Sequence, residues 1–569
     1  MEYKWIVLVN TSLGVIMASI NMYIVLISLP TIFRGLNVNP FLPGEFDYLL
    51  WVLMGYSMVL ASILVTFGRI SDLYGRTRLY TLGFIVFAAS SILLSIIPSN
   101  SGNLGVMLLI VFRMIQAIGG GFIMVNSTAL LTDAFPSSER GKALGLNQAS
   151  FIIGSFLGII LGGLLSNYDW HLIFVVNVPF AVTGALWSAL KLRRTSNSIK
   201  VKIDYWGNIT LAAGLVLMSL GFTYALMPYG NSEMGWGNPI VISSFIVGAI
   251  MLAAFIPVEL RQESPLFNIS LFKVKPFTYG IMALFLSSVA RGAIMFLLTI
   301  WLQGIYLPLH GFSYLETPFW AGIYMLPMLV GVVVMAPIGG ALTDRYGARI
   351  VATVGMAIIA VSLYLLTLLP YNFNLAEFES ILFINGFGNG LFSAPNTTSI
   401  MNALHPRDRG VGNGMRQTFS NVGSTISMAM FFSIAMSIFS QYVPARIHEV
   451  ALSYGLPMDV VSALSRIPAS SLLFAAFLGV DPASILPSTI TNNLPANIVN
   501  ALNSSAFLPS VLGPPFMMGL RISLYISIML VIIGAVLSYM RGEKYIYEES
   551  KEEKRIYPNN KLSSPREHP

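Results

Sequence analysis

The residues best placed to do chemistry are a few polar side chains inside long apolar stretches. Arg113 and Gln116 lie in one such stretch, and Arg291 and Gln303 lie in another. A charged side chain at the centre of a membrane span costs from about 2.5 to more than 10 kcal/mol unless it faces a cavity or finds a partner. We therefore expect Arg113 and Arg291 to contact a substrate or a coupling ion. The alternative for Arg113 is a structural role, with hydrogen bonds to backbone carbonyls of nearby helices.

Two short polar loops repeat one another in the two halves of the chain. Glycine lets helix ends approach closely, and an aspartate pairs with arginine or with the positive end of a helix. The loops therefore predict a conformational latch between Asp72 or Asp344 and basic neighbours such as Arg76. The alternative is a charge cluster that only sets the topology. The predicted latch residues are Gly68, Asp72, Gly75, Arg76, Arg78, Gly340, Asp344, Gly347 and Arg349.

Other kinds of chemistry find no support in the sequence. There is no cysteine, which excludes disulfides and thiolate metal sites, and the five histidines are scattered over separate loops and the tail. We find no nucleophile elbow and no phosphate-binding loop of the ATPase type. We therefore expect neither an enzyme nor an ATP-driven pump, and no cofactor or metal. A pore or receptor is disfavoured by the two-fold repeat described below.

The composition places these residues in a membrane protein. The chain has 569 residues, of which 55% are hydrophobic and 10% charged, and its mean hydropathy is +0.73. A soluble domain has about 25% charged residues. The apolar runs are long and continuous, so the spans are expected to be helices with internally satisfied backbone hydrogen bonds. The net charge of +7 is attributed to loops that fix the topology, and no nucleic-acid partner is expected.

Fourteen stretches are long enough to cross about 30 Å of hydrocarbon. Lysine and arginine concentrate in alternate loops, which predicts that both termini are cytoplasmic in a multi-pass protein of the cell membrane. The first stretch follows Lys4 and has no clear cleavage site, so it is expected to be retained. The expected spans are 6–30, 48–70, 79–97, 104–133, 143–165, 172–191, 205–228, 238–260, 276–306, 318–342, 351–370, 378–402, 411–440 and 516–540.

An internal repeat relates the first six spans to the last six. The loop from Gly68 matches the loop from Gly340 at an offset of 272, Asn126 matches Asn396 at 270, and Arg140 matches Arg409 at 269. The matched loops lie on the same predicted side, so the halves are parallel repeats, a known transporter plan. The expected domains are a bundle at 1–195, a two-helix insert at 196–265, a second bundle at 266–541 that includes an external loop at 441–515, and a cytoplasmic tail at 542–569.

These motifs resemble those of the major facilitator superfamily. The stretch Gly68 to Arg78 is similar to its Gly-x-x-x-Asp-x-x-Gly-Arg-x-Arg loop, and Arg113 to Gly121 is similar to its Arg-x-x-Gln-Gly element. Trp170 and the stretch Phe174 to Pro179 resemble the fourteen-span drug:proton antiporter branch (EmrB/QacA-like). The resemblance implies an all-α membrane fold of two parallel six-helix repeats plus two extra central helices, working by alternating access.

One position departs from that branch. The family's span-1 element carries an aspartate where this chain has Asn21, and we found no Asp or Glu at the middle of any expected span. A membrane-embedded carboxylate is the usual way to bind a proton and to attract a cationic drug. Tyr56 and Tyr324 lie deeper than the aromatic residues at the span ends. The predicted substrate and coupling cavity is Asn21, Tyr56, Arg113, Gln116, Arg291, Gln303 and Tyr324.

Small residues in the fifth span are similar to the glycine-rich element of the family's antiporters. They are Gly154, Gly158, Gly162 and Gly163, and Ile159 stands where the family has proline. Small residues allow two membrane helices to pack closely, so we expect a tight helix contact here. The alternative is that these glycines have no special role.

Two transport functions remain open. The first is proton-coupled export of drugs or other amphipathic molecules, and the alternative is a carrier of an anionic or polar metabolite, since Arg113 and Arg291 lack matching carboxylates. The expected partners are a small-molecule substrate, protons and the lipid bilayer, with the protein acting as a monomer. The external stretch from about Gln441 to Pro515 is too long for an ordinary loop. It is interpreted as a hairpin over the external mouth or as an insertion without a transport role.

Overall fold

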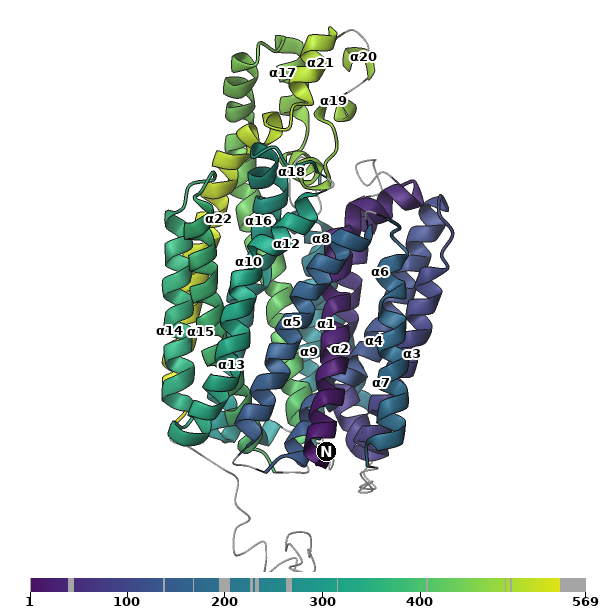
Figure 1. The fold of residues 1–569 in the computed structure, drawn as a ribbon, viewed down its shortest axis with the longest axis vertical. Coiled ribbons are helices and arrows are strands. Elements are labelled where there is room, and N and C mark those ends of the chain that lie inside the picture. Colours follow the sequence, from purple (N-terminus) through teal and green to yellow (C-terminus); the bar gives the residue numbers. More distant parts are fainter. Residues whose placement is uncertain are drawn as a thin grey trace, which may run out of the picture.

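The computed structural model describes residues 2–38, 46–136, 139–166, 168–193, 205–225, 229–230, 235–261, 269–314, 316–405, 408–486, 488–491 and 494–542. Apart from Gly542, the predicted tail lies outside the described residues. Helices dominate, and Figure 1 shows two bundles standing side by side, one purple to blue and one teal to yellow. We call the end near the N-terminus the basal end and the opposite end the distal end.

The first bundle contains α1 (Tyr3–Leu36), α2 (Phe46–Tyr74), α3 (Arg76–Ser95), α4 (Gly102–Ala134), α5 (Arg140–Ser166), α6 (Leu172–Val175) and α7 (Asn177–Lys191). It is followed by α8 (Tyr205–Ala225), η1 (Gly235–Gly237), α9 (Pro239–Arg261) and η2 (Ile269–Lys273). The second bundle contains α10 (Lys275–Ile300), η3 (Trp301–Tyr306), α11 (Leu307–Leu309), α12 (Thr317–Tyr324), α13 (Leu326–Tyr346), α14 (Ala348–Leu368), α15 (Leu375–Asn402), α16 (Arg409–Ser453) and α22 (Phe507–Met540).

Twelve helices among the described residues are long and apolar enough to cross a membrane. Two other long helices, α2 with 29 residues and α15 with 28, stand in the bundles beside them. The α15 helix is less apolar because Asn385, Asn389 and Asn396 lie inside it, all buried. The structure is compatible with fourteen spans, and that count stays a prediction.

The helices of the two bundles pack in the same scheme. In the first bundle α1 contacts α4, α5 and α7, while α3 contacts α4 and α7. In the second bundle α10 contacts α15, α16 and α22, while α14 contacts α15 and α22. Each helix of the first bundle therefore has a counterpart in the second. The bundles meet where α5 packs on α13 and where α16 packs on α2, which are equivalent contacts in the two halves.

The glycines of the two repeated loops have the same backbone conformation. Gly75, between α2 and α3, has a φ of 99°, and Gly347, between α13 and α14, has a φ of 81°. A side chain is strained at such positive φ values, whereas glycine adopts them readily. The two matching turns join consecutive helices at the basal end of each bundle.

The stretch between α16 and α22 forms a subdomain at the distal end. It comprises α17 (Met458–Arg466), α18 (Ala469–Leu478), α19 (Pro482–Ile485), α20 (Ser488–Thr491) and α21 (Ala496–Leu502). Figure 1 shows it above the second bundle, on extended α16 and α22 helices. α16 and α22 run well past their expected spans, because residues such as Ile447, Leu464 and Leu473 give this region an apolar core that is continuous with the core of the bundles. α18 also contacts the π-helical segment η3 of the second bundle.

The two extra helices lie beside the junction of the bundles. α8 contacts α2 of the first bundle and α16 of the second, and α9 packs mainly on α8. Only 22% of the apolar window of α9 is buried inside the molecule, so most of its surface is left for lipid. The boundaries drawn from the sequence at 195, 265 and 541 stay predictions.

Candidate functional site

A cavity of about 320 Å³ lies between the two bundles. Its walls come from α1, α2, α4, α5 and α8 on one side and from α10, α13, α15 and α16 on the other. Ligand sites in proteins are concave, mostly apolar and supplied with a few placed polar groups. Among the described residues, no group of His, Asp and Glu could hold a metal ion.

Two helices face each other across this cavity in the same register. α5 contributes seven lining positions and α16 contributes seven, and every member of one set lies 269 residues from a member of the other. The α5 set is Asn147, Gln148, Phe151, Ile152, Ser155, Phe156 and Ile159, and the α16 set is Arg416, Gln417, Ser420, Asn421, Ser424, Thr425 and Met428. The repeat therefore builds the cavity and is not confined to the loops.

The charge of the cavity comes from the second bundle. Arg291 of α10 and Arg416 of α16 line it, and none of the described lining residues is acidic. Arg291 has a long hydrogen bond, 3.4 Å, from its Nε to the Ser287 carbonyl, and the Tyr23 hydroxyl lies near it. Arg416 is 4% exposed and donates from Nε to the Asn413 side chain, while its Nη2 has no partner. The sequence analysis identified Arg291 but missed Arg416.

Arg113 lies outside this cavity, in a buried contact of the first bundle. Its Nη1 donates to the backbone carbonyl of Asn21 at 3.1 Å and to the Asn21 side chain at 3.3 Å. The guanidinium also stands over the Tyr56 ring, 4.8 Å from its centroid. Gln116 donates to the Ser91 hydroxyl. The contacts of Arg113 favour its structural alternative, and they bring together two of the other predicted cavity residues, Asn21 and Tyr56.

The last two predicted cavity residues lie elsewhere in the second bundle. Gln303 is fully buried in η3, and neither of its amide atoms has a hydrogen-bond partner. Tyr324 ends α12 and packs beside Trp320, with ring centroids 6.1 Å apart. Neither is among the residues that line the cavity between the bundles. Of the seven residues predicted to line the cavity, Arg291 is the one found there.

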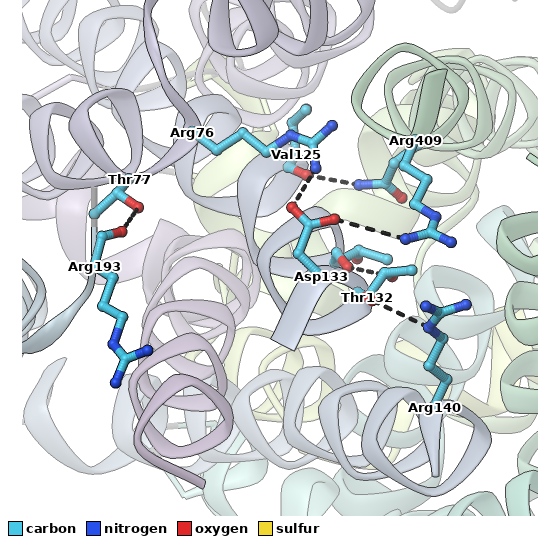
Figure 2. A network of polar contacts seen from close by, with 10 residues as sticks. Arg76, Thr77, Val125, Thr132, Asp133, Arg140, Arg193 and Arg409 are labelled. Atoms are coloured by element: carbon cyan, nitrogen blue, oxygen red, sulfur yellow. Dashed lines mark hydrogen bonds and ion pairs between the residues drawn. The ribbon is translucent and has the colours of Figure 1, made fainter. Parts of the chain in front are cut away.

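An ion-pair cluster joins the bundles at the basal end. Asp133, at the end of α4, accepts a hydrogen bond from Arg76 of α3, and its other oxygen lies 3.8 Å from Nη1 of Arg409 in α16 (Figure 2). The three side chains are mostly shielded, with exposures of 28% for Asp133, 11% for Arg76 and 10% for Arg409. Hydrogen bonds between ionised groups are stronger than neutral ones. One carboxylate thus connects both halves of the molecule.

Arg140 of α5 is the counterpart of Arg409 in the repeat, and it reaches from the first bundle towards the second. Its Nε donates to the carbonyl of Thr132 in the last turn of α4 at 3.1 Å (Figure 2). It also donates to the carbonyl of Phe135, directly after α4, at 3.1 Å. Its Nη1 lies 3.5 Å from the Asn402 side chain in α15 of the second bundle. The bundles are further linked by Asn413, which donates to the Val125 carbonyl at 2.8 Å.

Burial and neighbouring charges act on Arg409. Its pKa is lowered to about 10, first by burial, and Arg140 and Arg76 lower it further, while Asp133 raises it. The guanidinium is therefore still charged at neutral pH.

The predicted latch residues overlap with this cluster at one residue. Arg76 belongs to it, while Arg78 is exposed. The Asp72 side chain lies outside the described residues. In the second bundle Asp344 is half-buried near the end of α13, and the Arg349 guanidinium stands 4.0 Å from the centre of the Tyr539 ring. The sequence analysis placed Asp133 at the end of a span but gave it no role.

The glycines of α5 pack against helices on two sides. A Cβ at Gly158 would lie 2.5 Å from the Ile20 carbonyl oxygen, and Gly154 and Gly162 face α1 in the same way. Gly163 faces the opposite bundle, where a Cβ would lie 2.9 Å from the Phe319 backbone nitrogen in α12. Contacts this close require the absence of a side chain.

The family model for the Major Facilitator Superfamily matches residues 11–428. The chain is 30% identical over 436 residues to the riboflavin transporter RibZ of Clostridioides difficile (strain 630), which covers 76% of this chain and 88% of that protein. It is 27% identical over 438 residues to multidrug resistance protein 3 of Bacillus subtilis (strain 168), which covers 77% of this chain and 80% of that protein. A solved structure of the proton:xylose symporter XylE has a TM-score of 0.52 at 13% identity, over 76% of this chain and 89% of that one, and it supports the fold alone.

The chain belongs to the Major Facilitator Superfamily and is a multi-pass membrane transporter. Its all-helical fold and its two matching bundles are those expected from the motifs. The resemblance to the drug-exporting branch is confirmed, because relatives named as multidrug resistance proteins match most of the chain.

Proposed function

We propose that the protein exports amphipathic small molecules across the cell membrane by alternating access, as a monomer, with the basal end facing the cytoplasm. The observation that carries the proposal is the cavity between the bundles, lined at seven matching positions of α5 and of α16. Because these helices also contact the opposite bundle, rocking one bundle against the other would open the cavity to either side. The names of several relatives, as multidrug resistance proteins, support the direction of export.

The basal ion-pair cluster is proposed to hold the closed state at that end. Asp133 belongs to α4 of the first bundle, and Arg409 belongs to α16 of the second. Their distance must grow when the basal ends separate. In this proposal Asp133 and Arg409 act together with Arg76, and the latch roles of Asp72 and Asp344 stay predictions.

Proton coupling is proposed to act at Asp133. None of the described cavity residues is acidic, so a proton has no carboxylate beside the substrate. Protonating Asp133 removes the charge that pairs with Arg409 and weakens the basal contact. A proton arriving there would thus favour the basal-open state, in which substrate enters from the cytoplasm.

The test is transport in proteoliposomes with the full-length protein and an imposed pH gradient. Export predicts that a lipophilic aromatic probe accumulates against its gradient when the proton gradient is present and does not when it is collapsed. Uptake in the opposite direction, or transport that ignores the gradient, would contradict direction or coupling respectively. No saturable transport of any amphipathic probe would overturn the function.

The chain has no cysteine, which allows a direct view of the rocking motion. Tyr74 and Tyr346 are exposed at equivalent basal positions, with exposures of 59% and 58%. A Tyr74→Cys/Tyr346→Cys variant carrying spin labels should report two distance populations that shift on adding substrate. A single, ligand-independent distance would argue against alternating access.

A further inference from the structure

The two walls of the cavity differ in chemistry although they share a register. Along α5, apolar side chains fill four of the seven lining positions, including Phe151 and Phe156. Along α16 the equivalent positions carry Ser420 and Thr425, and Met428 is the one apolar residue of its set. The part of the wall formed by α5 is therefore more apolar than the part formed by α16.

Both cavity arginines replace uncharged residues of the repeat. Arg416 lies at the position of Asn147 in the first bundle, at the same offset of 269. At the same offset, Arg291 corresponds to Met22 of the first bundle, which also lines the cavity. This register agrees with the packing, because Gly154 meets Ile16 and Ser19 while Gly423 meets Phe285 and Ser288. The positive charge of the cavity is therefore a property of the second bundle alone.

The two arginines stand at different heights along the cavity. At 1.5 Å per residue, Arg291 lies roughly 24 Å along α10 and Arg416 roughly 10 Å along α16, both measured from the basal ends of the helices. Their positions along the helices thus differ by roughly 14 Å. They offer two successive positive positions, one at mid-depth and one nearer the basal end.

These charges lack carboxylate partners among the described residues. Neither arginine forms an ion pair in the structure, and the buried Nη2 of Arg416 has no hydrogen-bond partner. A charge withdrawn from water is costly until an opposite charge or strong acceptors reach it. An anionic group entering the cavity would supply both, while a cation would meet repulsion from two sites.

We propose that the cavity is selective for amphipathic organic anions, with the anionic group at Arg291 or Arg416 and the apolar body against Phe151 and Phe156. The proposal rests on the transport function above and names the substrate class of that same site. A guanidinium binds carboxylate, sulfonate and phosphate groups alike, so the shared feature is a single oxyanion on an apolar body.

The test uses three probes that share one aromatic body and differ in charge. They are 2-naphthoate, 2-naphthalenemethanol and trimethyl(2-naphthyl)ammonium. Equilibrium dialysis with the full-length protein in lipid nanodiscs, corrected against empty nanodiscs, should show 2-naphthoate bound at least tenfold more tightly than the ammonium probe. The preference should persist from pH 6 to pH 9, because the guanidinium and the carboxylate stay charged throughout that range.

The repeat supplies the matched variants. Arg291→Met and Arg416→Asn introduce the residues that the first bundle has at the same positions. The variant that removes the arginine holding the anionic group should weaken naphthoate binding about tenfold to hundredfold. Binding of the neutral alcohol should change less than threefold. The control Arg466→Gln removes an exposed positive charge of the distal subdomain and should leave all three affinities unchanged.

A charge reversal guards against variants that merely misfold. Arg291→Glu should favour the ammonium probe over naphthoate, a gain that damage to the fold would not produce. Equal affinity for the anion and the cation, or an anion preference unchanged in both Arg291→Met and Arg416→Asn, would overturn the proposal. If the ammonium probe is transported and naphthoate is ignored, the exporter function stands and the anion selectivity fails.

Discussion

Arg409 of α16 and Arg140 of α5 stand at equivalent positions of the repeat, and each reaches a helix end in the opposite bundle. Arg409 meets Asp133, and Arg140 meets Asn402, which lies 269 residues after Asp133. One corner thus joins the bundles through charge, and its counterpart does so through a neutral amide at 3.5 Å. The repeated geometry keeps both corners in register, while a single acidic residue concentrates the holding force, and any response to acid, at one of them.

The largest expected effect comes from removing that acid. Asp133→Asn leaves Arg76 and Arg409 without the carboxylate, and losing about 2 kcal/mol from the basal-closed state shifts the equilibrium about thirtyfold. We expect the initial transport rate in proteoliposomes to fall tenfold or more. The labels at positions 74 and 346 should report a longer mean distance. An unchanged rate and an unchanged distance would show that the cluster does not stabilise the basal-closed state.

Single substitutions of Arg409 and Arg140 should lower the transport rate by different amounts. Arg409→Gln breaks a cross-bundle ion pair and should lower the rate about fivefold to thirtyfold. Arg140→Gln should lower it less than threefold, because that side chain chiefly bonds the last carbonyls of α4 in its own bundle. Equal losses in the two variants would mean that the neutral corner matters as much as the charged one.

Moving the carboxylate to the Arg140–Asn402 contact tests whether an ion pair at that equivalent position can also hold the bundles together. Asp133→Asn combined with Asn402→Asp places a carboxylate beside Arg140. We expect the double variant to recover threefold to tenfold of the rate lost by Asp133→Asn alone. Rates are measured in the same proteoliposomes, with Asn402→Asp alone as the control. No recovery would indicate that Arg76, which has no arginine counterpart at Ala348, is indispensable to the contact.

A smaller effect is expected from the packing of α5 and α16 on their neighbours. Gly158 corresponds to Ser427, whose hydroxyl accepts a hydrogen bond from the Ala293 backbone at 2.8 Å. Gly158→Ser would force a Cβ to within 2.5 Å of the Ile20 carbonyl and should destabilise the fold by about 1–3 kcal/mol. Ser427→Gly should cost about 1 kcal/mol. Melting temperatures of the purified variants check the order, and a reversed order would contradict the packing.

The fold could be predicted from the sequence because its determinants are local and repeated. Apolar runs set the helices, and the glycine turns at Gly75 and Gly347 recur in the structure with matching backbone angles. The distal extensions of α16 and α22 were not predicted, because their apolar residues face a subdomain core and not lipid.

The site was harder to predict because it depends on which helices meet. Arg113 looked like a cavity residue, yet its partner Asn21 lies in its own bundle. Arg416 was not predicted to line the cavity, although it lies 269 residues after Asn147, the same offset that separates Arg140 from Arg409. Carrying that offset along α5 and α16 would have found the second wall. The pairing of Asp133 with Arg409 depends on contact between bundles, which no local pattern encodes.

One helix, α16, connects the basal ion-pair cluster, the cavity and the distal subdomain. α16 runs as 45 residues from Arg409, along the cavity wall, to Ser453 in the distal subdomain. At 1.5 Å per residue it is a rod about 68 Å long, and each degree of tilt about its base moves its far tip by about 1 Å. Pro444 interrupts its hydrogen bonding near that tip, where some bending is absorbed. An antibody fragment bound to the distal subdomain would thereby act as a lever on the contact at the basal end.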